Sequence, residues 1–168
     1  MLEQPRGPSM NLDLNTIYQQ CLGIDTVTRR LSPAEELVDD AHFDEHATLV
    51  LRASGMDKAF QLSAYQLDVG AVLGRTTSRT SKYLNIQIDL TPFQGEALGV
   101  SRQHAYLCYD SDNQMVKVMD LDSSNGTKVN GQRLHPDEVR VLRHGDRLRL
   151  GKLEFVVMIQ QASSNSHS

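Results

Sequence analysis

A chain of 168 residues can hold one domain of ordinary size with extensions, since domains cluster near about 100–150 residues. Hydrophobic residues make up 39% and charged residues 23%, which excludes a disordered chain, and no apolar run approaches the roughly 20 residues that cross a bilayer. The net charge of −4 excludes an overall basic field, so we do not expect nucleic acid as a partner. Because no apolar run could cross a bilayer, we expect a cytoplasmic protein without a membrane partner.

The first 44 residues differ from the rest of the chain. They hold three of the five prolines and an acidic stretch at residues 35–40, and they lack period-2 alternation. Apolar residues recur at helical spacing from Leu14 to Leu22, and Ser32-Pro33-Ala34-Glu35 is typical of a capped helix start. We therefore expect residues 1–44 to be an N-terminal extension that is flexible or forms two short helices.

From His46 onward, short runs rich in Leu, Val, Ile and aromatic residues alternate with turn-forming clusters, a pattern typical of an all-β sandwich or barrel. We expect this domain to cover residues 45–160 and to be followed by a disordered polar tail at 161–168. The expected strands are Thr48–Arg52, Ala59–Gln66, Val72–Gly74, Ile86–Ile88, Ala105–Tyr109, Val116–Asp120, Lys128–Val129, Gln132–Leu134, Asp146–Leu150 and Glu154–Ile159.

Two hairpins are predicted near the end of the domain. Asn130-Gly131 lies between two short strands and suits a type I′ turn, in which both central residues have positive φ. Gly151-Lys152 separates two strands whose apolar residues alternate on both sides of the turn. We expect these last strands to form a β-meander.

Four motifs lie at strand–loop junctions, where a β-sandwich usually binds its ligands. They are Leu73-Gly74-Arg75, Ser101-Arg102-Gln103-His104-Ala105, Asp120-Leu121-Asp122-Ser123-Ser124-Asn125-Gly126-Thr127, and Val129-Asn130-Gly131. In this order and at these spacings, the set resembles the signature of the forkhead-associated (FHA) domain family. The resemblance covers roughly Leu49 to Ile159, including the turn His144-Gly145-Asp146.

The resemblance implies an FHA-type β-sandwich of about eleven mainly antiparallel strands with a pocket for phosphothreonine. Arg75 is then expected to contact the phosphate and Ser101 to donate a hydroxyl hydrogen bond to it. Arg102 and Ser124 are expected to line the pocket, and Asn125 to hold the backbone of the bound peptide. These residue types suit the ligand, because a phosphate is best met by a guanidinium fork and hydroxyls, and an amide side chain both donates and accepts.

Other residues of the motifs are expected to be structural. Glycine at positions 74, 126 and 131 suits unusual backbone shapes or close approach, and Asn130 belongs to the hairpin turn. His104 enters an alternating strand, so we interpret it as a buried brace between loops. Alternatives remain for three of the pocket residues. Arg75 could be a solvated surface side chain, and Ser101 and Ser124 could simply cap turns through their own backbone.

Metal and catalytic sites are not expected. Asp120 and Asp122 lie in a serine-rich turn and are interpreted as turn-stabilising side chains instead of a cation site. His42 and His46 have helical spacing but precede a strand, and Cys21 and Cys108 are interpreted as two buried or half-buried thiols. No nucleophile, P-loop or metalloprotease motif is present, so we expect no enzyme activity and no cofactor.

One departure from the family pattern concerns the 25 residues between Arg75 and Ser101, a stretch that is shorter in many members. The insertion enlarges the rim of the expected pocket. Arg79 and Lys82 in this stretch would meet acidic residues that flank the phosphothreonine, or would simply be solvated.

The expected function is that of a phosphothreonine-dependent, non-catalytic adaptor in Ser/Thr kinase signalling. Its partner would be a phosphothreonine-containing protein, such as a Ser/Thr kinase or one of its substrates. A phosphate-independent interaction or scaffold domain on the same sandwich remains one alternative. Another is a self-inhibited switch in which phosphorylated Thr26 or Thr28 occupies the chain's own pocket.

Overall fold

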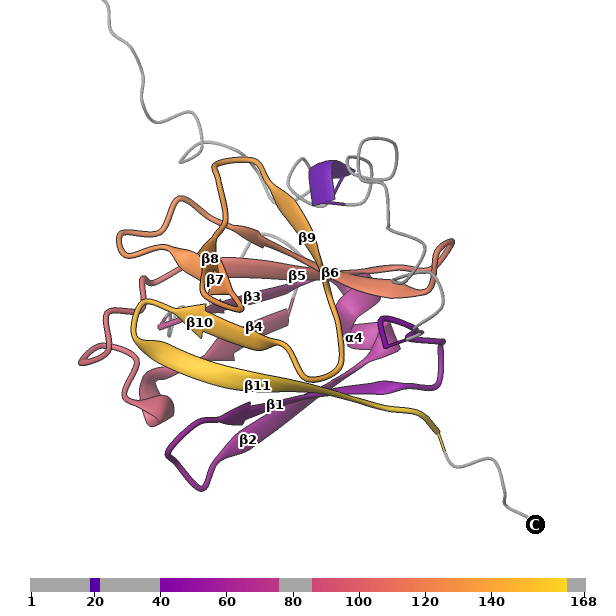
Figure 1. Ribbon diagram of the computed structural model, residues 1–168, viewed down its shortest axis with the longest axis horizontal. Helices are drawn as coiled ribbons and strands as arrows, with labels where there is room; N and C mark the ends of the chain where they lie inside the picture. Colours follow the sequence, from indigo (N-terminus) through magenta and orange to yellow (C-terminus); the bar gives the residue numbers. More distant parts are fainter. Residues whose placement is uncertain (1–18, 22–39, 76–85, 163–168) are drawn as a thin grey trace, which may run out of the picture.

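The computed structural model describes residues 19–21, 40–75 and 86–162, and in this part of the chain it places two β-sheets face to face (Figure 1). One sheet has the strand order β2-β1-β11-β10-β7-β8 and the other the order β4-β3-β5-β6-β9. The elements are β1 (Thr48–Ala53), β2 (Ala59–Ser63), α4 (Ala64–Val69), β3 (Ala71–Gly74), β4 (Ile86–Asp89), the 3-10 helix η1 (Thr91–Phe93), β5 (Ala105–Asp110), β6 (Met115–Asp120), β7 (Thr127–Val129), β8 (Gln132–Arg133), β9 (Val139–Leu142), β10 (Arg147–Leu150) and β11 (Leu153–Gln160).

The predicted fold class is confirmed. Eleven strands form the described sandwich, and every recorded pair of neighbours is antiparallel except β3 with β4. Residues 19–21 are helical, and no helix in the described residues is long and apolar enough to span a membrane.

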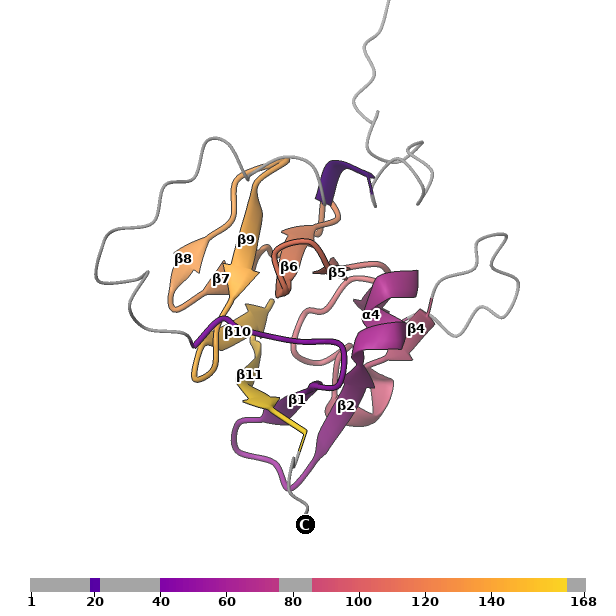
Figure 2. The ribbon, with the colours of Figure 1, turned by 90° about the vertical axis from the view of Figure 1, so that its right-hand side faces the viewer.

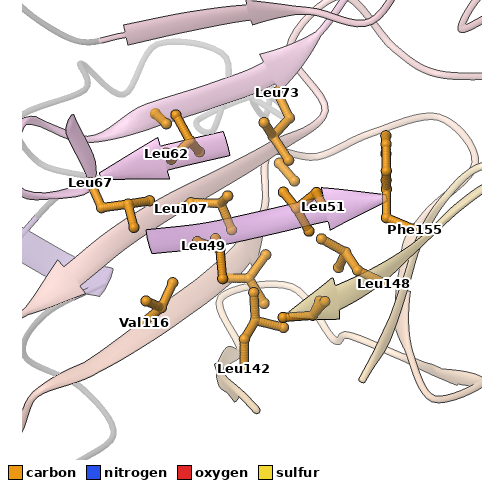
Figure 3. Close-up of a cluster of buried hydrophobic side chains, with 14 of the residues drawn as sticks. Leu49, Leu51, Leu62, Leu67, Leu73, Leu107, Val116, Leu142, Leu148 and Phe155 are labelled. Carbon is orange, nitrogen blue, oxygen red and sulfur yellow. The ribbon is translucent and has the colours of Figure 1, made fainter. Parts of the chain in front are cut away.

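The core lies between the two sheets and consists of side chains that alternate along each strand (Figure 3). On β1, Leu49 and Leu51 point into this core, and on β5 Leu107 does the same from the opposite sheet. Phe155 of β11 packs edge-to-face with Phe60 and Phe93, at ring centroid distances of 5.5 and 5.6 Å. The aromatic cluster ties η1 to the sandwich and so fixes the start of the loop that leads to Ser101.

The five-stranded sheet is buried on its outer face as well. Every residue of β5 is buried, and Tyr106 and Cys108 belong to a second apolar cluster with Met119 and Cys21. The two cysteines are buried free thiols, as predicted, although they come from distant parts of the sequence. Burial and the neighbouring Cys21 thiol raise the pKa of the Cys108 thiol, so it remains protonated and packs as an apolar group.

The prediction of a strand over Ala59–Gln66 is wrong beyond Ser63. The Ser63 hydroxyl accepts a hydrogen bond from the backbone N–H of Gln66, and the Gln66 side chain accepts one from the backbone N–H of Ser63. This reciprocal capping box starts α4 at Ala64, where Leu67 supplies a buried apolar contact. The apolar residues of the segment fit both periods, so the alternation alone could not separate strand from helix.

The final strands do not form the expected simple meander, because β9 was not predicted and joins the opposite sheet. Its apolar ends lie on different faces: Val139 joins the outer cluster, whereas Leu142 lies in the main core. A strand buried on both faces has no simple alternation in its sequence. The two hairpins themselves are confirmed, with Val129 opposite Gln132 across Asn130-Gly131 and Leu150 opposite Leu153 across Gly151-Lys152.

Several sequence predictions lie outside the described residues. These are the helix expected to start at Ser32, the phosphorylation sites at Thr26 and Thr28, the rim residues Arg79 and Lys82, and residues 163–168 of the expected tail.

A fully buried ion pair links β5 to β6. The Lys117 ammonium lies 2.8 Å from the Asp110 carboxylate, and the two side chains are 0% and 7% exposed. Asn113 donates further hydrogen bonds to Asp110 from its backbone and side-chain amides. Burial works against ionisation of Asp110, but these hydrogen bonds and the Lys117 charge outweigh it and lower the pKa of the carboxyl group.

We expect Asp110→Ala to lower the free energy of unfolding by about 3–5 kcal/mol, because it removes the carboxylate 2.8 Å from an ammonium group that stays buried. Lys117→Met should cost less, since Asp110 keeps its bonds from Asn113. Urea unfolding of both variants at neutral pH checks the order. Equal losses below about 1 kcal/mol for both variants would contradict this account.

Candidate functional site

The three main motifs meet at one end of the sandwich, although they are far apart in the sequence. On adjacent strands Leu73 lies opposite Ala105, and Ala105 lies opposite Asp120. The end of β3, the start of β5 and the end of β6 therefore lie side by side, and the loops at 75, 101–104 and 121–126 leave from this edge (Figure 1).

Gly74 allows two of these loops to approach each other. A Cβ atom at this position would lie 1.9 Å from the backbone oxygen of Arg102, a distance that no side chain can adopt. The contact is completed by the Arg75 N–H, which donates to the Ser101 carbonyl at 3.1 Å. The predicted structural role of Gly74 is thus explained by close backbone packing.

His104 connects the other pair of loops from inside the protein. Its side chain is 0% exposed, Nδ1 accepts a hydrogen bond from the Ser101 N–H, and Nε2 lies 2.9 Å from the Gly126 carbonyl oxygen. Because an N–H can only donate and a carbonyl can only accept, this pair of partners fixes a neutral ring with its proton on Nε2. Burial lowers the pKa of His104, although the Gly126 hydrogen bond and the Asp120 charge oppose this.

Arg75 is held by its inner nitrogen. Nε donates to the Val100 carbonyl oxygen at 2.5 Å, and the side chain is half-buried. The terminal Nη groups make no hydrogen bond within the described part of the chain. The guanidinium is therefore held through Nε, and no described residue engages its outer donors.

The two pocket serines contact each other across the loops. The backbone N–H of Ser124 donates to the Ser101 hydroxyl oxygen at 3.0 Å. This oxygen accepts, and the Ser101 O–H donates to no other residue that the structure describes. Ser101 is half-buried and Ser124 is exposed, so both are reachable from solvent.

Asn125 is exposed and already uses one half of its amide. Its Nδ2 donates to the Gly99 carbonyl oxygen at 2.9 Å, which leaves Oδ1 as an acceptor at the surface. The segment that supplies this carbonyl is itself fixed, because the Lys152 N–H donates to the Leu98 carbonyl at 2.7 Å. Asn125 thus links the 121–126 loop to the insertion that follows Arg75.

The 120–127 turn is organised by Asp120, as predicted. Its carboxylate accepts hydrogen bonds from the backbone N–H and hydroxyl of Ser123 and from the hydroxyl of the buried Thr127. The Ser123 hydroxyl oxygen then accepts from the Gly126 N–H. No group of three metal-ligating side chains is found in the described ranges, and the donors around Asp120 account for its role in the turn.

Two further predicted residues, Asn130 and Gly131, form the turn between β7 and β8. Asn130 and Gly131 have φ values of 52° and 84°, which fit the type I′ turn, and the Asn130 side chain bonds Asp146 and the Arg147 N–H. These two hydrogen bonds of Asn130 attach the β7–β8 turn to the segment that leads into β10. Arg102 is exposed, and its side chain makes no hydrogen bond to a described residue.

Two structural contributions to the site were not predicted from the sequence. The insertion is more than an enlarged rim, since residues 98–100 supply the carbonyls that hold Arg75 and Asn125. Arg133 of β8 also reaches the site: its guanidinium would lie 2.7 Å from a Cβ atom at Gly126. Glycines at 95 and 99 hint at tight turns, but no sequence pattern points to Arg133.

Comparison with known proteins agrees with this geometry. The family model described as "FHA domain" matches residues 72–151, which include all the predicted site residues. Residues 72–151 of this chain are an FHA domain. The flanking strands β1 and β11 and the hairpin partner β2 complete the same sandwich outside the matched range.

Relatives of this FHA domain occur in distant organisms. "Angiogenic factor with G patch and FHA domains 1" of Homo sapiens is 37% identical over 59 residues, which are 33% of this chain and 8% of that relative. An FHA domain of Arabidopsis thaliana has 22% identity, covers 76% of this chain and 95% of its own, and gives a TM-score of 0.51. EmbR of Mycobacterium tuberculosis, in complex with a low-affinity phosphopeptide, has 20% identity, covers 78% and 30%, and gives a TM-score of 0.51.

The neutral His104 of this FHA domain predicts a pH dependence of stability. The unfolded chain takes up a proton below about pH 6.5, whereas the folded chain resists it because the pKa of His104 is lowered. The contribution of His104 is therefore full above that pH and falls on acidification, by at most about 1.4 kcal/mol per pH unit for one proton. We expect His104→Gln to be less stable than the wild type at about pH 7.5 and the difference to narrow at about pH 5.5.

Urea unfolding of both proteins at several pH values measures this difference, and the five other histidines cancel because both proteins carry them. A difference that stays constant or widens on acidification would show that the folded protein accepts a proton on His104.

Proposed function

We propose that this chain is a phosphothreonine-dependent, non-catalytic binding module that acts as a cytoplasmic adaptor in Ser/Thr kinase signalling. The single observation that carries the proposal is the state of Arg75 at the meeting point of the loops. Its Nε is anchored to the Val100 carbonyl, while its Nη donors have no partner among the described residues. A guanidinium prepared in this way suits a phosphate, because two parallel donors match two oxygens of a dianion.

Neighbouring groups add the remaining donors that a phosphate needs. The Ser101 hydroxyl oxygen accepts from the Ser124 N–H, and its proton, which no described residue accepts, can rotate toward a phosphate oxygen. Ser124 is exposed beside it, and Arg102 and Arg133 add positive charge at the surface around the loops. A local basic site of this kind fits a phosphate on a chain whose net charge is −4.

Asn125 is assigned to the peptide backbone. With Nδ2 engaged by the Gly99 carbonyl, its Oδ1 is the atom available to accept an N–H from an extended peptide. This leaves sequence selectivity to side chains around the rim. The partner is then a protein with an accessible phosphothreonine, such as a Ser/Thr kinase or its substrate.

The proposal predicts that Arg75→Ala weakens binding of a degenerate phosphothreonine peptide library by about 10- to 150-fold, the cost of one lost charge-assisted donor. Arg75→Lys should recover only part of this, because an ammonium keeps the charge but not the fork. Fluorescence anisotropy with matched phosphothreonine, phosphoserine and unphosphorylated peptides measures both effects. Arg52→Ala, an exposed arginine of β1, is the matched control.

Binding that ignores the phosphate, or that survives in Arg75→Ala, would instead favour a phosphate-independent interaction domain. If the wild type binds no peptide, mass spectrometry of the protein purified from its host and after kinase treatment tests the self-inhibited alternative. Absence of phosphate on both Thr26 and Thr28 would remove that alternative.

A further inference from the structure

A hollow lies at the end of the sandwich away from the loops around Arg75 and Ser101. It has a volume of about 300 Å³ and is lined by Glu45, Ala64, Tyr65, Asp68, Tyr109, Ser111 and Gln114. This volume is at the lower end of the range for ligand pockets, about 300–1,000 Å³, and so suits one side chain better than a larger molecule.

The position of this pocket follows from the topology. Arg75 and His104 flank one end of the paired strands β3 and β5, whereas α4 precedes β3 and Tyr109 and Ser111 lie at the far end of β5. Figure 1 shows α4 and the β5–β6 turn on the side opposite the β10–β11 turn, and Figure 2 looks onto the α4 side. The six residues of β5 separate the two sites by about 17–20 Å.

Tyr109 is the residue that marks the hollow as a binding site. Its side chain is only 4% exposed and contacts Phe43 edge-to-face at 5.5 Å, yet it makes no hydrogen bond within the described part of the chain. Its hydroxyl is also not among the fully enclosed unsatisfied atoms, so it is reached from the pocket it lines. A buried phenol normally has a partner for its O–H group, and here that place is open to a ligand.

The charge around this hydroxyl is negative. The pKa of the Tyr109 hydroxyl is raised, mainly by burial and to a smaller extent by the charges of Asp44, Glu45, Asp68 and Asp110. Of these carboxylates, Asp110 is paired with a buried lysine, whereas Asp68 is exposed and makes no ion pair with a described residue. Glu45 lies 3.4 Å from the exposed imidazole of His46, which would compete for it only when protonated.

The rim of the pocket adds an aromatic surface. Tyr65 is 76% exposed and is the one large hydrophobic side chain that is exposed among the described residues. It follows the capped start of α4 directly, so the helix holds its backbone in place. An aromatic ring beside carboxylates is suited to a cation with an apolar stem, because the ring face attracts the charge and the stem covers the ring.

From these features we propose that the pocket between α4 and the β5–β6 turn binds a lysine or arginine side chain of a partner protein, independently of the phosphate site. The cationic head would lie against Asp68 and Glu45 and donate to the Tyr109 hydroxyl oxygen, and the stem would lie on Tyr65. The Ser111 hydroxyl and the Gln114 amide oxygen offer further acceptors at the rim.

The test uses the full chain, labelled with nitrogen-15, and the probes Nα-acetyl-arginine methylamide and Nα-acetyl-lysine methylamide. The neutral citrulline and Nε-acetyl-lysine counterparts serve as probes without charge. In two-dimensional NMR we expect saturable shifts for the amides of Tyr65, Asp68, Ser111 and Gln114 with the charged probes, and weak or no saturation with the neutral ones. The signals of the 101–104 loop should not move.

Two conservative variants decide whether the pocket is responsible. Asp68→Asn and Tyr109→Phe each remove one interaction at nearly constant volume and should weaken binding about three- to tenfold, whereas Asp57→Asn in the β1–β2 turn should leave it unchanged. The same spectra show that each variant is folded. The proposal would be overturned if charged and neutral probes bound equally, or if Asp68→Asn left binding of the charged probes unchanged. It would also be overturned if no amide signal showed a saturable shift at probe concentrations up to about 50 mM, the weakest binding that such a titration measures.

Discussion

The buried imidazole of His104 is the contact on which the loop end of this sandwich depends. One ring nitrogen accepts from the Ser101 N–H and the other donates to the Gly126 carbonyl, so a single side chain fixes two loops that come from different strands. Gly126 also accepts from the Gly151 N–H, which extends the link to the β10–β11 turn. Because His104 contacts both loops through backbone groups, it holds them without using the side chains of Ser101, Ser124 and Asn125.

The site is built mainly from backbone carbonyls that orient exposed side chains. The carbonyls of Gly99 and Val100 hold Asn125 and Arg75, and the segment that carries them is fixed by Phe93 in the core and by Lys152. Holding a long side chain by its inner nitrogen reduces the entropy lost when the outer ones bind a ligand. Residues 91–100, the last part of the insertion after Arg75, therefore belong to the scaffold that holds the site.

A feature of the fold or of the candidate site could be predicted from the sequence where it depends on residues that are neighbours in the chain. The Asn130-Gly131 turn, the family motif and the buried role of His104 follow from short patterns, because turn chemistry and alternation are properties of neighbouring residues. The capping box at Ser63 is also local, but its apolar residues fit a strand equally well. By contrast β9, buried on both faces, and Arg133 above Gly126 depend on packing between distant segments, which no short pattern contains.

The two ends of the sandwich carry different sets of charged side chains beside their candidate sites. The loop end gathers Arg75, Arg102 and Arg133, whereas the α4 end gathers carboxylates around Tyr109. Charges about 17–20 Å apart are screened from each other at physiological ionic strength, where the Debye length is about 8 Å. If both proposed sites bind, each can act without weakening the other, and one partner that carries both a phosphate and a basic side chain would be oriented along β5.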